Sequence, residues 1–166
     1  MDDTFFMEQA LEQARQALDR GEFPVGCVMA YENRVLVTGS RHHSTTAQRN
    51  ELDHAEILAL RRLVDMGGSV RRERVAVFST LEPCLMCYSA LIVNGIRRIV
   101  YAYEDVLGGG TKVDLKSLTP FYQDMEIEVL PGVQRQQSLD LFKKFFADPQ
   151  NDYLRGTILA EHALGD

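Results

Sequence analysis

Short apolar runs alternate along this chain with longer amphipathic segments, and no other feature constrains its fold as strongly. The short runs have the length and composition of buried strands, whereas the longer segments repeat their apolar residues at helical spacing. An alternation of strands and helices is typical of layered α/β domains with a central sheet. We therefore expect an α/β fold.

The expected elements follow from this pattern and from the turn residues between the runs. They are helices over 7–18, 54–64, 83–94, 133–146 and 153–164, a hairpin of strands over 25–31 and 35–38, and single strands over 75–78, 96–101 and 127–130. Asp53 is the expected cap of the second helix, and Pro83 is the expected cap or first residue of the third. No repeat or linker interrupts the 166 residues, so we expect a single domain over residues 1–166.

Two short clusters, His54-Ala55-Glu56 and Pro83-Cys84-Leu85-Met86-Cys87, carry residues suited to chemistry. Cys84 and Cys87 are three residues apart in the first turn of an expected helix, so both sulfur atoms can face one point. A helix N-terminus favours the thiolate form, which a metal ion requires. His54 begins another expected helix and offers a neutral ring nitrogen. Two thiolates and one imidazole suit tetrahedral zinc.

Three protein ligands leave one position of a tetrahedral zinc ion open, whereas structural zinc sites are normally closed by four. An open position indicates bound water and catalysis, because zinc lowers the pKa of such a water to about 7. Hydrolysis of an amino group also requires protons on the leaving nitrogen and on a ring nitrogen. Glu56, two residues after His54, is the expected proton shuttle.

Two other interpretations of the cysteine pair stay open. A Cys-x-x-Cys pair also occurs as half of a structural metal site or as a redox pair. A structural site needs a fourth ligand, for which Cys27, His42 and His43 are candidates, although Cys27 is expected to be a small core residue on a strand. A redox pair does not require a His-x-Glu sequence upstream. The odd count of three cysteines argues against a disulfide framework.

Over roughly its first 105 residues the chain resembles the cytidine/deoxycytidylate deaminase superfamily, whose signature joins His-x-Glu to Pro-Cys-x-x-Cys. The segments Phe23–Gly26, His54–Ile57 and Thr80–Cys87 are most similar to the tRNA adenosine deaminases, with the guanine deaminases next. The likeness continues over Gly95–Tyr101.

This resemblance implies a three-layer cytidine-deaminase-like fold, in which a five-stranded mixed sheet packs between helices. The catalytic core then spans about residues 4–105, and residues 106–166 supply the C-terminal strand and helices. A homodimer with the active site near the subunit boundary is the assembly that the resemblance implies.

The resemblance also implies the roles of individual residues. One Zn²⁺ ion per chain is held by His54, Cys84 and Cys87. Glu56 is the catalytic proton shuttle. The base pocket is lined by the peptides near Ala55, Glu82 and Pro83.

The loop before His54 departs from the tRNA adenosine deaminases. In those enzymes an asparagine after the second strand reads the edge of the base, whereas Arg41 falls at the corresponding position of this chain. Arg41 is therefore a candidate pocket residue, and Asn50 is a candidate replacement for the asparagine. The loop up to His54 is also about two residues longer than in those relatives.

The C-terminal tail departs further. It carries four acidic residues, Asp148, Asp152, Glu161 and Asp166, against the single Arg155. Such a tail repels phosphate. We expect its apolar residues to form a packing face rather than a stacking platform for bases; they are Tyr153, Leu154, Ile158, Leu159 and Leu164. We expect Gly108–Gly110 to form a flexible turn.

The favoured hypothesis is a zinc-dependent hydrolytic deaminase that converts adenosine to inosine in tRNA. The alternative is a deaminase of a free base or nucleoside, such as guanine, cytosine or a related heterocycle, which suits the net charge of −6. A non-catalytic partner subunit is a third hypothesis, disfavoured because Glu56 is present. Apolar runs fall short of the roughly 18 residues that span a bilayer, and the acidic N-terminus is unlike a secretory signal. We therefore expect a cytoplasmic protein without a membrane partner.

Overall fold

A five-stranded mixed sheet forms the middle layer of the molecule, in the order β2-β1-β3-β4-β5. The computed structural model describes residues 1–45, 47–68 and 70–166. The strands are β1 (Gly26–Tyr31), β2 (Arg34–Ser40), β3 (Ala76–Leu81), β4 (Arg98–Tyr103) and β5 (Glu128–Leu130). β1 runs antiparallel to β2 and β3, whereas β3, β4 and β5 run parallel to one another.

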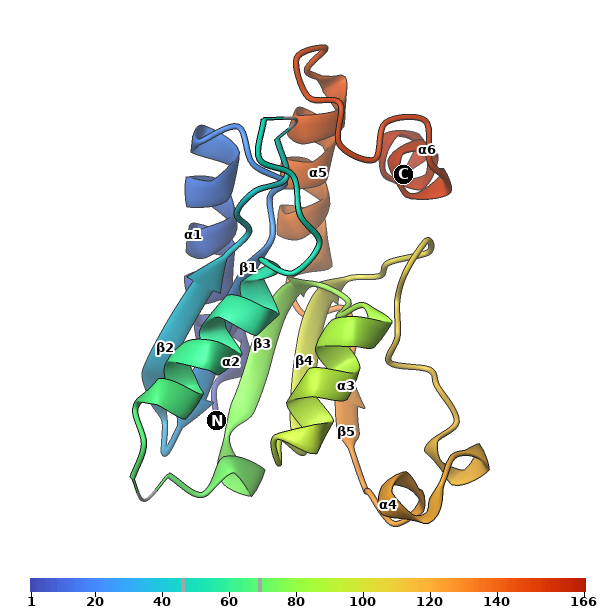
Figure 1. The fold of residues 1–166 in the computed structure, drawn as a ribbon. Coiled ribbons are helices and arrows are strands. Elements are labelled where there is room, and N and C mark those ends of the chain that lie inside the picture. The colour runs from blue at the N-terminus through green and yellow to red at the C-terminus, as the bar shows by residue number, and fades with distance from the viewer. Residues whose placement is uncertain (46, 69) are drawn as a thin grey trace.

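Helices cover both faces of this sheet. The helices of the described residues are α1 (Asp3–Asp19), α2 (Ala55–Asp65), α3 (Leu85–Val93), α4 (Pro120–Gln123), α5 (Arg135–Ala147) and α6 (Ile158–Gly165), with 3-10 turns over Arg72–Arg74 and Leu115–Ser117. α2 and α3 lie side by side on one face, and α1 and α5 lie on the other (Figure 1). The expected sheet packed between helices is confirmed.

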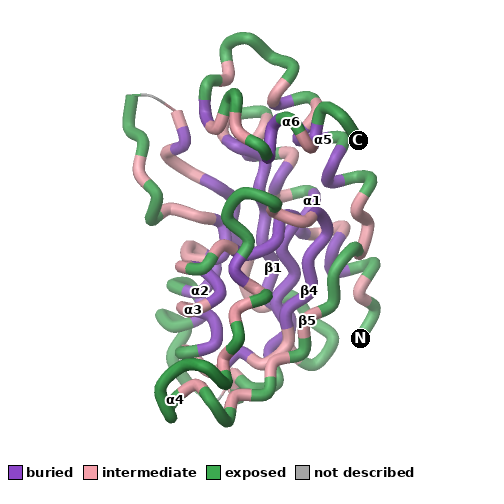
Figure 2. The backbone as a smooth tube through the Cα atoms, turned by 90° about the vertical axis from the view of Figure 1, so that its right-hand side faces the viewer, coloured by how far each residue is buried: buried purple, intermediate pink, exposed green. Residues whose placement is uncertain are grey.

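Continuous burial along the central strands reflects the three layers, because successive strand side chains point to opposite faces and both faces are covered. Val28 of β1 packs in a cluster with apolar residues of α1, whereas its neighbour Cys27 packs with Ala59 of α2 and Leu91 of α3. Figure 2 shows the buried residues concentrated in the strands and in the helix faces turned toward them. Cys27 is fully buried, as expected of a small core residue on a strand.

The hairpin also fixes where α2 begins. A Cβ atom on Gly39 of β2 would lie 2.2 Å from the carbonyl oxygen of Ala55. Only glycine therefore lets the first turn of α2 approach the strand so closely. This contact places the start of α2 at the same end of the molecule as the start of α3 (Figure 1).

Two predicted helix starts are wrong by one or two residues. His54, not Asp53, is the N-cap residue of α2, because the Asp53 carboxylate accepts a hydrogen bond from Asn50 Nδ2 at 2.8 Å instead. Cys84, not Pro83, is the N-cap residue of α3, and the Pro83 carbonyl accepts a hydrogen bond from the Gly110 N–H at 2.9 Å.

The last helix begins later than predicted. α6 starts at Ile158, and Tyr153 lies in a turn before it. Leu154 and Gly156 have φ angles of 55° and 72°, which interrupt the right-handed helical backbone. Within the described residues, no helix is both long and apolar enough to cross a membrane.

Candidate metal centre and substrate pocket

Three side chains from the starts of α2 and α3 meet at one point. His54 Nδ1 lies 3.6 Å from Cys84 Sγ and 3.5 Å from Cys87 Sγ. Bonds of about 2.0–2.1 Å to nitrogen and about 2.3 Å to sulfur place the two ligand types about 3.6 Å apart in a tetrahedral zinc site. The predicted ligands therefore come together with the spacing that zinc requires.

The sequence brings these donors together through two helix N-termini. Cys84 and His54 are N-cap residues, and Cys87 lies in the first turn of α3. The positive end of each helix dipole thus faces the sulfur atoms and favours their thiolate form. A hydrogen bond from Cys87, together with His54, lowers the pKa of the Cys84 thiol to about 4. The same pairing and burial raise the pKa of Cys87.

The candidates for a fourth protein ligand lie elsewhere. Cys27 is in the core, His42 Nδ1 lies 2.8 Å from the Ser40 carbonyl oxygen, and His43 Nδ1 lies 2.5 Å from Asp53 Oδ2. Among residues 1–45, 47–68 and 70–166, the metal-ligating group around His54 has three members. A tetrahedral ion held there keeps one position free for another ligand, as in catalytic zinc sites.

Glu56 lies beside these donors on the first turn of α2. Its side chain is only 3% exposed, and Oε2 lies 3.7 Å from Cys87 Sγ. Oε1 accepts a hydrogen bond from Ser79 Oγ at 3.0 Å. Burial raises the pKa of the Glu56 carboxyl group, which makes it a better proton carrier near neutral pH. The role of Ser79 was not predicted from the sequence, in which this residue follows the expected strand over 75–78.

A cavity of about 170 Å³ opens above this group. It is lined by residues predicted for the site, namely Arg41, His54, Ala55, Glu56, Glu82 and Cys84. Cys87 is fully buried, and Pro83 is buried but is absent from the described lining residues. The cavity size suits a single heterocyclic base rather than a large ligand.

Aromatic and apolar side chains form further walls of the cavity, which the sequence did not predict. They are Phe23, Val25, Leu81, Leu107, Tyr153 and Leu154. The ring centroids of Phe23 and Tyr153 are 5.1 Å apart, and Tyr153 is buried. Tyr153 therefore packs against other apolar residues as expected, and it also lines the cavity.

Arg41 is 2% exposed, and its N–H groups point into the loop that follows it. The guanidinium donates hydrogen bonds to the carbonyl oxygens of Asn50 at 2.8 Å and Asp53 at 3.1 Å, and to that of His42. Arg41 thus lines the cavity while its guanidinium organises the loop. The Asn50 side chain also forms hydrogen bonds within the loop. Asn50 is not among the described residues that line the cavity.

The glycine-rich loop is tightly packed rather than a free turn. A Cβ atom on Gly110 would lie 2.5 Å from the backbone nitrogen of Leu85, at the start of α3. The Glu82 carboxylate secures the same loop, since it accepts hydrogen bonds from Thr111 Oγ1 at 2.5 Å and from the Asp105 N–H at 3.2 Å. Burial raises the pKa of Asp105, which also lines the cavity.

This fold and three-donor centre define a class of zinc-dependent deaminases. The family model described as the cytidine and deoxycytidylate deaminase zinc-binding region matches residues 1–103, and the chain belongs to this family. Membership confirms the expected deaminase class and the cytidine-deaminase-like fold.

Relatives within the class differ in the substrates that their names state. The chain is 34% identical over 140 residues to a tRNA-specific adenosine deaminase of Rickettsia typhi, covering 84% of this chain and 95% of the relative. A solved structure from a study of A-to-I editing by tRNA:A34 deaminases matches with a TM-score of 0.70 and 31% identity, covering 83% of this chain and 99% of that one. The guanine deaminase of Nitrosomonas europaea shares the fold, with a TM-score of 0.69, 20% identity, and coverage of 87% and 85%.

Proposed function

We propose that this chain hydrolyses the exocyclic amino group of an adenosine in tRNA, releasing ammonia and leaving inosine. The observation that carries the proposal is the buried Glu56 carboxyl beside three zinc-compatible donors, at the floor of a base-sized cavity. The similarity to tRNA-specific adenosine deaminases over most of both chains supports the choice of substrate.

His54, Cys84 and Cys87 are the proposed ligands of one zinc ion per chain. Zinc held by these residues would supply a Lewis acid that lowers the pKa of a water molecule to about 7. Burial acts to lower the pKa of His54, but its hydrogen bond with Cys84 and the nearby negative charges raise it overall. Proton release from this side chain therefore accompanies metal binding.

Glu56 is the proposed proton carrier. The reaction joins the oxygen of one water to the ring carbon and breaks the bond from that carbon to the amino nitrogen. One water proton moves to the adjacent ring nitrogen, and the other moves to the leaving amino group, which departs as ammonia. Glu56 Oε2 is the atom available for both transfers, because Oε1 accepts the Ser79 hydrogen bond.

The cavity walls supply the proposed base pocket. Phe23 and Leu154 give it apolar surface that excludes water, and Ala55 lies beside the proposed reaction centre. Arg41 and Glu82 act mainly by holding the two loops that frame the pocket. Pro83 supports the second of these loops through its carbonyl oxygen.

A second candidate is deamination of a free base or nucleoside. The carboxylates of Glu82 and Asp105 line the cavity together with Glu56, and the chain carries a net charge of −6. Negative charge at the pocket repels the phosphates of a nucleic acid, but not a neutral heterocycle. This observation favours a small substrate such as guanine, cytosine or a related base.

Ammonia release distinguishes these two candidates. Zinc-loaded protein is assayed with free bases, nucleosides, nucleotides and an anticodon stem-loop that carries adenosine at the wobble position. The proposal expects release from the stem-loop, with inosine as the product. Release from a small molecule alone would replace the tRNA proposal with the second candidate. Release from no substrate by zinc-loaded protein would favour a non-catalytic subunit.

The proposed setting is a cytoplasmic homodimer. Leu85 on α3 and Leu107 and Phe121 beyond β4 are exposed apolar side chains, which are suited to contact with a second subunit. Light scattering after size-exclusion chromatography tests this assembly, for which the expected mass is twice 18.8 kDa.

A further inference from the structure

One carboxylate oxygen joins the proposed metal ligand His54 to the C-terminal segment of the chain. Glu51 Oε2 lies 3.4 Å from His54 Nε2 and accepts a hydrogen bond from the Tyr153 hydroxyl at 2.7 Å. The same oxygen lies 3.4 Å from Arg41 Nη2. Side chains from three separate parts of the sequence therefore converge on Glu51.

The two ring nitrogens of His54 face different partners. Nδ1 faces the sulfur atoms of Cys84 and Cys87, whereas Nε2 faces the Glu51 carboxylate. A metal ion takes the unprotonated nitrogen of a histidine, so the other nitrogen carries the proton. A carboxylate that accepts this proton in a hydrogen bond fixes the ring orientation and makes the histidine a stronger ligand.

We propose that Glu51 is a positioning residue of the metal centre. Its carboxylate accepts a hydrogen bond from the Nε2–H group of His54, while Tyr153 and Arg41 hold this carboxylate in place. This inference rests on the proposed zinc site, but it is independent of the substrate. It also gives a role to the long loop and to the C-terminal turn, which depart from the sequence pattern of the tRNA enzymes.

Arg41 and Tyr153 are well placed to hold Glu51. The buried Arg41 guanidinium bonds to the loop backbone on both sides of Glu51, at the carbonyl oxygens of Asn50 and Asp53. Its central carbon lies 5.4 Å from the centroid of the Tyr153 ring, within the range of a cation–π contact. The Glu51 side chain itself is 61% exposed, so water competes for its oxygens and moderates its effect.

Zinc affinity, measured by competition with a chromogenic chelator, tests the proposal. Removal of a group that orients a metal ligand typically lowers affinity about 10–100-fold, and the exposure of Glu51 favours the lower end of that range. We expect Glu51→Ala to lower zinc affinity about tenfold. Glu51→Gln retains an acceptor oxygen but loses the charge, so it should give an intermediate loss. Tyr153→Phe should weaken zinc binding less than Glu51→Ala.

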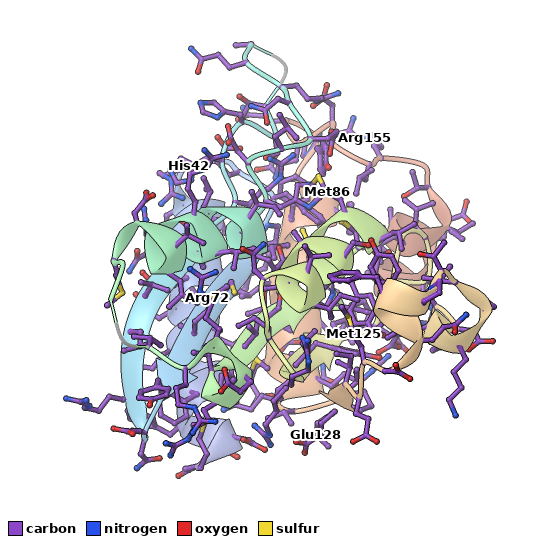
Figure 3. The ribbon with its side chains drawn as sticks, turned by 60° about the horizontal axis from the view of Figure 1, so that its bottom comes forward. His42, Arg72, Met86, Met125, Glu128 and Arg155 are labelled. Atoms are coloured by element: carbon purple, nitrogen blue, oxygen red, sulfur yellow. The ribbon has the colours of Figure 1, made fainter. Side chains whose placement is uncertain are left out.

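Glu128→Ala is the matched control. The Glu128 side chain is 63% exposed and pairs with Arg98 at 3.2 Å, which resembles the exposure and ion pairing of Glu51. It lies at the opposite end of the molecule from His42, a residue of the Glu51 loop (Figure 3). The zinc affinity of the Glu128→Ala variant should equal that of the wild-type protein.

The absorption spectrum of the cobalt-loaded protein separates positioning from a purely structural role. Reorientation of His54 alters the ligand field, so Glu51→Ala should change the visible bands while circular dichroism shows an intact fold. Wild-type zinc affinity and an unchanged cobalt spectrum in Glu51→Ala would overturn the inference alone. Failure of the wild-type protein to bind zinc would instead overturn the proposed metal centre.

Discussion

Replacement of Phe23 by alanine should destabilise the protein and open the pocket wall. The Phe23 ring is buried, and its centroid lies 5.1–6.0 Å from the rings of Phe142, Phe145, Phe146 and Tyr153. Truncation of a buried phenylalanine costs about 3–5 kcal/mol, a range that already contains the contribution of its aromatic contacts. We therefore expect Phe23→Ala to lower the free energy of unfolding by about 4 kcal/mol.

Urea unfolding of the zinc-saturated protein measures this loss. Met66→Ala is the control, because the Met66 side chain is 52% exposed and its removal should change stability by less than about 0.5 kcal/mol. Phe23→Leu preserves most of the apolar volume and should cost less than about 1.5 kcal/mol. A loss below about 2 kcal/mol in Phe23→Ala would refute the packing argument, since it lies outside the range for a buried ring.

Three further changes test other parts of the site and fold. Ser79→Ala removes the hydrogen bond to the Glu56 carboxyl, so kcat should fall about tenfold, equivalent to about 1.4 kcal/mol, while zinc content by atomic absorption is unchanged. Gly110→Ala forces a Cβ atom against the start of α3 and should cost about 1–3 kcal/mol in urea unfolding; wild-type stability would contradict the close approach. The hydrogen bond from Arg135 lowers the pKa of Glu104 to about 2. The ionised Glu104 side chain therefore stabilises the folded protein above the unfolded-state pKa of about 4.3, and this contribution is lost as the pH falls toward 2. The stability difference between wild type and Glu104→Gln should therefore shrink over that pH interval, and a constant difference would contradict the ion pairing.

The proposed metal ligands could be predicted from the sequence because their signal is local. Cys84 and Cys87 are fixed relative to each other by one helical turn, and His54 stands at the start of a strongly amphipathic helix. Because α2 and α3 run in the same direction on one face of the sheet, their starts lie at the same end (Figure 1). The sequence therefore predicts His54, Cys84 and Cys87 as zinc ligands, and both cysteine sulfur atoms lie within 3.6 Å of His54 Nδ1.

The pocket walls were not predictable from local patterns. Phe23 precedes the first strand and Tyr153 follows the fifth helix, so only the tertiary fold joins them. The left-handed backbone at Leu154 interrupts an apolar pattern that indicated a continuous helix. The helix α3 begins after the predicted residue because the Pro83 carbonyl bonds to Gly110, which is distant in sequence.

The central claim is that Glu56 moves protons at a zinc centre built from His54, Cys84 and Cys87. The measurement that tests it most directly is turnover and zinc content of Glu56→Ala, on the substrate that gives the highest ammonia release. Glu56→Ala should keep one zinc per chain and lose at least about 100-fold in kcat, whereas Cys84→Ala should lose the metal itself. Zinc-loaded Glu56→Ala with wild-type turnover would contradict the account.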